Sequence, residues 1–221
     1  MSDELPFSLL DEPEQLATYD GWSAEVYRDL LELQAGRMSH AELDAKYLYR
    51  TTILTLDMTG FTTSCFEGRQ VEAFLRILNA QKVCIPVLRE HDATLVRAFA
   101  DDLVALFDDP GKALDAAQEI HRRIGLFNAS GLATENPAYC SIGLGFGDVY
   151  RIGPNLSMGD EMNRSSRLGE DTARGAETLV TESFRDALAH RKDVQFEPVT
   201  HDDVLFPYFR VSIRPAGGLS A

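Results

Sequence analysis

Residues 53–62 read Ile-Leu-Thr-Leu-Asp-Met-Thr-Gly-Phe-Thr, and this stretch decides the fold. The run that begins at Thr51 is β-branched and apolar, which predicts a buried strand that ends at Asp57. A carboxylate at a strand end can hold a divalent cation, and Gly60 lets the backbone N–H groups of a tight turn approach phosphate oxygens. For this motif alone, a solvated turn aspartate is the more common explanation, so the neighbouring elements have to decide.

A second acidic motif follows within residues 94–107. Two short apolar stretches are separated by Ala100-Asp101-Asp102, which predicts a tight hairpin. In the expected order of elements this hairpin lies beside the strand that ends at Asp57, so Asp57 and Asp101 converge. Two carboxylates at neighbouring strand ends suit a pair of hard cations that bridge phosphate groups. Asp102 adjoins Asp101, so the position of the second ligand stays open by one residue.

The remaining pattern predicts an α+β domain with a ferredoxin-like split βαββαβ order. Its sheet is expected to be mostly antiparallel, with helices on one face. The expected elements are a strand at 51–56, a helix at 68–91, the hairpin at 94–107, a helix at 110–127, a second hairpin at 139–152 that turns at Gly147-Asp148, a helix at 159–168, a strand at 178–181, a helix from Glu182 and a strand at 205–211.

The ends of the chain differ from this central pattern. Residues 1–48 are predicted to form a helical extension, with one helix near 24–33 and a second capped at Ser39. Residues 49–212 form the main domain. The Gly- and Ser-containing stretch 213–221 is predicted to be a disordered tail.

Composition excludes several classes of function. The chain has 221 residues, with 21 Lys and Arg against 35 Asp and Glu, which gives a net charge of −14. Phosphate backbones attract Lys and Arg, so a nucleic-acid polymer is not expected as a partner. No stretch approaches the roughly 18 apolar residues of a membrane helix, and the N-terminus lacks signal-peptide features. The three cysteines are far apart and lack metal-ligand spacing, so a cytoplasmic protein without membrane contact is expected.

Three motifs together resemble the class III nucleotidyl cyclases. Residues 53–62 look like the first metal-binding motif of that family, and residues 96–107 look like the second. Residues 159–167, Gly-Asp-Glu-Met-Asn-Arg-Ser-Ser-Arg, resemble the helix whose Asn and Arg stabilise the transition state. The motifs fall in family order and at family spacing, over about residues 50–212.

The resemblance implies a lyase that joins the ribose 3′-oxygen to the α-phosphorus of a nucleoside triphosphate and releases pyrophosphate. It also implies a homodimer, because in this family the metal carboxylates and the Asn/Arg helix come from different subunits. The resemblance further implies that Asp57 and Asp101, with the Met58 carbonyl, bind two Mg²⁺ or Mn²⁺ ions per site. It implies that the triphosphate is bound by Gly60, Phe61 and Thr62. Asn163 would then orient the ribose, and Arg167 would stabilise charge on the α-phosphate.

Some positions depart from the family pattern. Ala100 replaces the usual Gly before the second metal Asp, and Met162 and Ser165 replace the usual Val and Ala beside Asn163. The lysine that family members often supply near the last hairpin has no clear counterpart. Arg50 is one candidate to compensate, although a solvated strand-edge arginine is the more common explanation for such a residue.

Two further departures concern the base. Adenylate cyclases have Lys, and guanylate cyclases Glu, at the position that Arg97 takes here; Leu156 takes the second base-reading position. Arg97 has no acceptor for the amino edge of guanine. Leu156 cannot accept from the exocyclic amine of adenine or cytosine, and burying that amine unpaired costs roughly 1–3 kcal/mol. The two acceptors of uracil suit a guanidinium, so UTP is the expected substrate, with CTP next.

The pattern is most similar to the pyrimidine cyclases of bacterial Pycsar anti-phage systems. That resemblance implies synthesis of cyclic UMP as a second messenger that acts on a separate effector protein. Two alternatives remain: an adenylate cyclase in which Arg97 replaces Lys, and a nucleotide-binding domain without activity. The second alternative predicts the loss of a motif residue, yet Asp57, Asp101, Asn163 and Arg167 are all present.

Overall fold

The computed structural model describes residues 8–19, 21–58, 70–132, 137–153, 156–201 and 203–213. The chain divides into two compact units: Met1–Tyr49 with Val149–Gly159, and Arg50–Asp148 with Asp160–Ala221. The first unit therefore contains a segment, Val149–Gly159, that the expected extension at 1–48 does not include. The division into 1–48, 49–212 and 213–221 stays a prediction, and residues 214–221 of the tail lie outside the described part of the chain.

The first unit is a small helical assembly with a β-hairpin. Ser39 and Glu42 form a capping box at the start of its third α-helix, as expected from the sequence. Asp29 accepts hydrogen bonds from Lys46 Nζ at 2.6 Å and Tyr47 Oη at 2.7 Å, which tie this helix to the one before it. The elements are α1 (Pro13–Leu16), η1 (Ala17–Tyr19), α2 (Ala24–Gln34), α3 (His40–Tyr47), and β5 (Leu156–Met158) paired with the end of β4.

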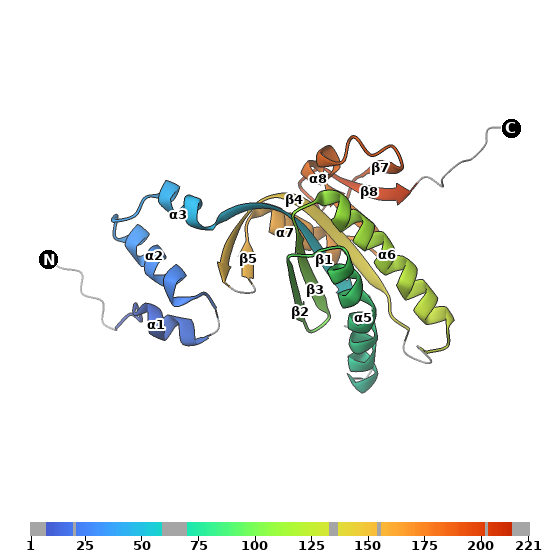
Figure 1. The fold of residues 1–221 in the computed structure, drawn as a ribbon, viewed down its shortest axis with the longest axis horizontal. Helices are drawn as coiled ribbons and strands as arrows, with labels where there is room; N and C mark the ends of the chain where they lie inside the picture. Colours follow the sequence, from blue (N-terminus) through green and yellow to red (C-terminus); the bar gives the residue numbers. More distant parts are fainter. Residues whose placement is uncertain are drawn as a thin grey trace. The chain divides into compact units, whose positions relative to one another are not determined.

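One mixed sheet runs through the structure in the order β2-β3-β1-β4-β6-β8-β7 (Figure 1). The β1–β3, β2–β3, β6–β8 and β7–β8 pairs are antiparallel, and β4–β6 is parallel. The strands are β1 (Leu48–Met58), β2 (Leu95–Phe99), β3 (Asp102–Phe107), β4 (Cys140–Gly153), β6 (Thr178–Thr181), β7 (Val194–Val199) and β8 (Tyr208–Ile213).

Helices cover both faces of this sheet. Leu54 and Leu56 belong to the main core, together with side chains of α5 (Gln70–Glu90) and α6 (Pro110–Ala129). Successive strand residues point to opposite faces, so Thr55 faces the other way, and its Oγ1 donates to the Ser165 carbonyl of α7 (Asp160–Ser166) at 2.7 Å. The expectation of helices on one face is wrong. The continuous run of apolar and threonine residues in β1, buried on both faces from Thr51 to Leu56, is typical of a strand covered on both sides.

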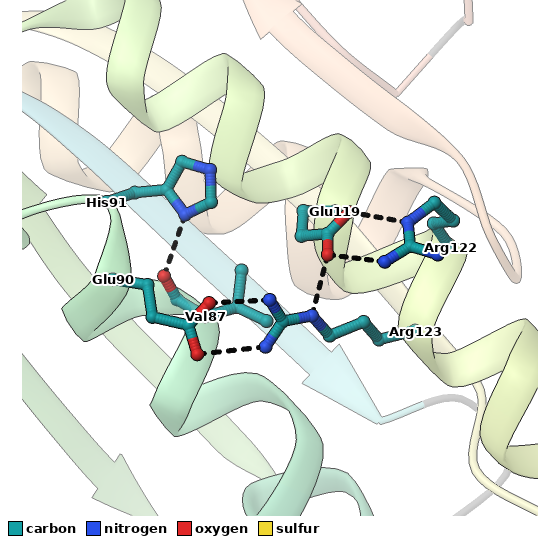
Figure 2. Close-up of polar contacts among 6 residues, drawn as sticks. All are labelled: Val87, Glu90, His91, Glu119, Arg122 and Arg123. Atoms are coloured by element: carbon teal, nitrogen blue, oxygen red, sulfur yellow. Dashed lines mark hydrogen bonds and ion pairs between the residues drawn. The ribbon is translucent and has the colours of Figure 1, made fainter.

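Helices α5 and α6 are joined by a polar cluster at the surface (Figure 2). Glu119 accepts from Arg122 and Arg123 on its own helix, and Arg123 also reaches Glu90 of α5 at 2.5 Å. His91 bonds the Val87 carbonyl at 2.9 Å. Among the described residues, no helix is long and apolar enough to cross a bilayer.

Two strand predictions need correction. The expected hairpin across Gly147-Asp148 does not exist, because β4 runs without a break from Cys140 to Gly153. A Cβ atom on Gly147 would lie 3.1 Å from the Cβ and Cγ of Glu161, so this glycine allows close packing and does not make a turn. The sequence pattern also missed the short strand β5 and the edge strand β7. In β7, Pro198 argues against a strand, although Pro is tolerated at the edge of a sheet.

Candidate active site

The acidic half of the candidate site lies where β1 meets the β2–β3 hairpin. Asp57 is the last residue but one of β1, and its strand partner is Asp102. Asp101 occupies the two-residue turn before it, next to Ala100, whose φ of +49° lies in the region that favours glycine. Cross-strand partners project from the same face of a sheet. The structure thus brings Asp57, Asp101 and Asp102 to one corner, as the sequence predicted.

The electrostatics of this corner are unfavourable in the protein alone. Burial, followed by the charges of Asp101, Asp102 and Glu170, raises the pKa of Asp57 to about 7, although a backbone hydrogen bond from Met58 opposes the rise. Burial and neighbouring carboxylates also raise the pKa of Asp102 and of Glu170. Every charged side chain found to perturb Asp57 in the described structure is a carboxylate, so a bound cation would relieve the repulsion.

The donor atoms at this corner fit a hard divalent cation. Carboxylate and backbone carbonyl oxygens are the ligands that Mg²⁺ prefers, and Mg²⁺ usually retains water or substrate phosphate ligands as well. Within the described ranges no group of three acidic, His or Cys side chains is already gathered around one point. The carboxylates therefore supply only part of a coordination shell. Gly60, Phe61 and Thr62 lie outside the described residues.

The second half of the site is carried by α7 and the π-helical turn η2 (Arg167–Thr172) that follows it. Asn163 and Arg167 are exposed. Arg167 forms an ion pair with Asp171 at 2.6 Å, and its second terminal nitrogen lies 3.5 Å from the Asp203 carbonyl. In the part of the chain that the structure describes, no hydrogen bond or ion pair joins Asn163 or Arg167 to Asp57 or Asp101. Within a single chain, direct polar contacts therefore do not join the acidic half of the site (Asp57 and Asp101) to the helix half (Asn163 and Arg167).

Close backbone contact holds α7 against the sheet. A Cβ atom on Gly143 of β4 would lie 2.1 Å from the Ser165 carbonyl oxygen and 2.6 Å from the Gly169 nitrogen. Ser165 Oγ donates to the Gly143 carbonyl at 3.0 Å, and Thr55 Oγ1 donates to the Ser165 carbonyl. Ser165 therefore supplies a buried hydrogen bond to the sheet.

The two candidate base-reading residues lie in different units. Arg97 is in β2, paired with Val104, and its charge partly opposes the rise in the pKa of Asp102 that burial and Asp101 cause. Leu156 begins β5 and pairs with Gly153, but its side chain lies outside the described residues. Arg50, the candidate for the missing lysine, lies 3.7 Å from Asp148 and stacks over the Phe146 ring at 5.0 Å.

Sequence reasoning missed two acids that the structure places at the site. Glu170 shares the acidic corner, and Glu161 lies on the buried face of α7. One feature of the sequence indicates the position of Glu161. Glycines alternate along β4 at 143, 145 and 147, and so lie on one face of the sheet. Glycines on one strand face indicate the close approach of another element. No comparable signal marks Glu170.

The sequence matches no protein-family model and no curated protein. Solved structures do match. The adenylyl cyclase CyaB from P. aeruginosa superposes with a TM-score of 0.63 at 15% identity, over 76% of this chain and 97% of that one. The catalytic core of a rhodopsin-guanylyl cyclase with converted specificity, in complex with ATPαS, superposes with a TM-score of 0.64 at 19% identity, over 76% of this chain and 98% of that one.

A third similar structure is the non-canonical dimeric guanylyl cyclase domain of the RhoGC fusion protein from the aquatic fungus Blastocladiella emersonii. Its TM-score is 0.62 at 18% identity, over 76% of this chain and 97% of that one. Identities this low establish the fold alone. The chain has the α+β fold of the class III nucleotidyl cyclase catalytic domains.

Proposed function

We propose that the protein is a nucleotidyl cyclase that converts a pyrimidine nucleoside triphosphate, UTP above CTP, to the 3′,5′-cyclic monophosphate and pyrophosphate. The observation that carries this proposal is the acidic corner in a cyclase fold. Asp57, Asp101 and Asp102 lie together at the end of β1, with no cation found among the groups that perturb Asp57. Uncompensated buried charge of this kind is typical of a functional site.

Each candidate residue has a role in the reaction. Asp57 and Asp101, with the Met58 carbonyl, would hold two Mg²⁺ or Mn²⁺ ions, and the positive charge of these ions would stabilise the phosphates and favour attack by the ribose 3′-oxygen. Gly60, Phe61 and Thr62 cradle the triphosphate. Asn163 orients the ribose, and Arg167 stabilises charge on the α-phosphate as its bond to the leaving pyrophosphate breaks.

A homodimer completes the site in this proposal. Asn163 and Arg167 of one copy act on the substrate held by Asp57 and Asp101 of the other. An apolar surface beside the acidic corner supports a covering partner: α5 exposes four apolar side chains at helical spacing, and Phe99 at the hairpin is 70% exposed. Gln81 of α5 donates to the Ala100 carbonyl at 3.4 Å, which links the helix to the hairpin. The four side chains on α5 are Val71, Phe74, Leu75 and Leu78.

The choice of base rests on Arg97 and Leu156. A guanidinium donates to the uracil carbonyl oxygens, and leucine leaves an exocyclic amine unpaired. The fold alone does not decide the base, since one similar structure is a guanylyl cyclase with converted specificity in complex with ATPαS. By the resemblance to Pycsar cyclases, the product serves as a second messenger in anti-phage defence and acts on a separate effector protein.

The test is a substrate panel. The purified chain is incubated with Mn²⁺ and one of UTP, CTP, ATP or GTP, and the products are identified by mass spectrometry. Cyclic UMP as the main product is the expected result. A main product of cyclic AMP or cyclic GMP would keep the cyclase and overturn the base assignment. If none of the four nucleotides gives a product, two explanations remain: a missing activator or a nucleotide-binding domain without activity.

A further inference from the structure

The buried face of α7 carries a carboxylate to which the proposed reaction gives no role. Glu161 is only 7% exposed. Its Oε1 accepts hydrogen bonds from the Phe146 backbone N–H at 3.0 Å, from Ser183 Oγ at 2.5 Å and from Thr181 Oγ1. Burying a carboxylate is costly unless its oxygens are satisfied. These three donors lie on β4, α8 (Glu182–Ala187) and the end of β6, so one side chain ties α7 to three elements.

The strand beneath this carboxylate is shaped to receive it. A Cβ atom on Gly145 would lie 3.0 Å from Oε1 of Glu161, and one on Gly147 would lie 3.1 Å from the Glu161 Cβ and Cγ atoms. The second carboxylate oxygen faces Arg164, whose Nη1 lies 3.8 Å away. The carboxylate is thus enclosed by donors and by strand backbone, and a rotation of α7 would break these hydrogen bonds.

Helical geometry links this buried group to the candidate catalytic residues. Residues four apart share a helix face, so Glu161 and Ser165 lie together on the buried face. Asn163 lies about 200° around the helix from Glu161, at 100° per residue, and is exposed together with Arg167. The two buried anchors therefore set the rotation of the helix, and this rotation sets where the two exposed side chains point.

We propose that Glu161 is a positioning residue that fixes the rotation of α7 and so places Asn163 and Arg167 for the transition state. This inference rests on the proposed cyclase function. Glu161 itself points into the sheet and does not touch the substrate. Its effect therefore acts on kcat, through the two residues that act in the transition state, and leaves nucleotide binding at the acidic half nearly unchanged.

The test variant is Glu161→Gln, which keeps the side-chain volume. The amide oxygen still accepts, but the amide nitrogen is a donor that faces the guanidinium of Arg164. We expect kcat to fall about tenfold, with KM for the nucleotide within about twofold of wild type. Ser183→Ala removes one of three donors and is the milder variant, with an expected fall in kcat of about two- to threefold.

A matched control makes the same Glu-to-Gln substitution at an exposed glutamate. Glu182→Gln neutralises the neighbouring acid of α8, which is exposed and paired with Arg185. This variant should keep the kcat of wild type. A wild-type kcat for Glu161→Gln, or an equal loss in Glu182→Gln, would overturn the proposal.

Two readouts separate positioning from general damage. Hydrogen exchange should become faster in the peptide that covers residues 160–166 and stay unchanged at residues 95–107; unchanged exchange at 160–166 would overturn the proposal. Glu161→Gln chains should also be rescued by mixing with Asp57→Ala chains, and not with Asn163→Ala chains, because the defect belongs to the helix half; the reverse pattern would overturn it. If the wild type forms no product, the proposed function fails, and hydrogen exchange still tests the role of Glu161.

Discussion

Asp57 and Glu161 are both carboxylates withdrawn from water, and their surroundings are opposite. Glu161 receives three hydrogen bonds on one oxygen from three different elements. Asp57 is surrounded by Asp101, Asp102 and Glu170, and its pKa is raised to about 7. The folded chain supplies hydrogen-bond donors to one oxygen of Glu161 and a cation, Arg164, near the other, whereas the charges that act most strongly on Asp57 in the described part of the chain are all negative.

This contrast separates structural from functional burial. A satisfied buried acid fixes one arrangement of the chain and contributes to its order. An unsatisfied acid costs stability, and such a cost is typical of a site that binds a ligand of opposite charge. The helix half of the site is therefore ready in the folded chain, and the acidic half becomes favourable only with cations bound.

The largest expected effect comes from removing the charge at the acidic half. Asp57→Asn should lower kcat by about a thousandfold or more, because an amide is a poor ligand for the metal that stabilises the phosphates. The assay is cyclic nucleotide formation at saturating Mn²⁺. Asp186→Asn, a change at an exposed acid paired with Arg185, is the control and should keep full activity. Comparable activity in the two variants would remove Asp57 from the site.

The next largest effect is expected from a steric clash between β4 and α7, the helix that carries Asn163. Gly143→Ala places a Cβ atom 2.1 Å from the Ser165 carbonyl oxygen, so the backbone of α7 has to move. We expect the free energy of unfolding to fall by about 4 kcal/mol or more, measured by urea titration.

Gly125→Ala is the matched control for this change, because nothing lies within 4 Å of the new atom and the site is inside α6. It should raise the stability by about 0.5–1 kcal/mol. Equal stability of the two alanine variants would contradict the tight seating of α7.

A smaller effect on stability is expected when the charge of Asp57 is removed in the absence of metal ions. In EDTA at pH 8, Asp57→Asn should raise the free energy of unfolding by about 1–2 kcal/mol, because it removes a charge that the fold does not compensate and that keeps part of its solvent exposure. The folded-state pKa of Asp57 is about 7 against an ordinary 3.8. The gain is therefore complete above pH 7, falls as the pH drops towards 3.8, and vanishes below it.

Urea titrations of both proteins at pH 8 and pH 5 measure this difference. Titrating groups remote from the acidic corner contribute almost equally to the two proteins and cancel, whereas the coupling of Asp57 to Asp101, Asp102 and Glu170 is part of the measured difference. A variant that is less stable than wild type at pH 8 would mean that Asp57 is compensated within the fold.

The smallest expected effect concerns the turn that carries Asp101. Ala100 has a φ of +49°, a conformation that costs a non-glycine residue about 1–2 kcal/mol. Glycine avoids this cost, but it loses more conformational entropy on folding, so the net stabilisation is smaller. Ala100→Gly should therefore raise the unfolding free energy by up to about 1 kcal/mol while activity stays unchanged. Ala176→Gly, at a φ of +60° away from the acidic corner, should give a similar gain and is the reference. A loss of stability in the first variant alone would show that Ala100 makes a contact that favours alanine.

The sequence predicted the acidic half better than the helix half, for a physical reason. The apolar run before Asp57 and the hairpin around Asp101 are local patterns, and two neighbouring strands are enough to bring these acids together. Glu161 has no local pattern, because its donors lie 15 to 22 residues away along the chain. The continuity of β4 was missed for the same reason: Gly147 is explained by a contact with α7 and not by its sequence neighbours.

The central claim is that each active site combines the acidic half of one chain with the helix half of another, and one mixing experiment tests it most directly. Asp57→Ala and Asn163→Ala chains are each inactive alone; after subunit exchange, the mixed dimer contains one intact site. The account predicts that cyclic nucleotide formation returns, up to about one quarter of the wild-type rate for equal amounts of chain and random pairing. A mixture that exchanges subunits and stays inactive would contradict it.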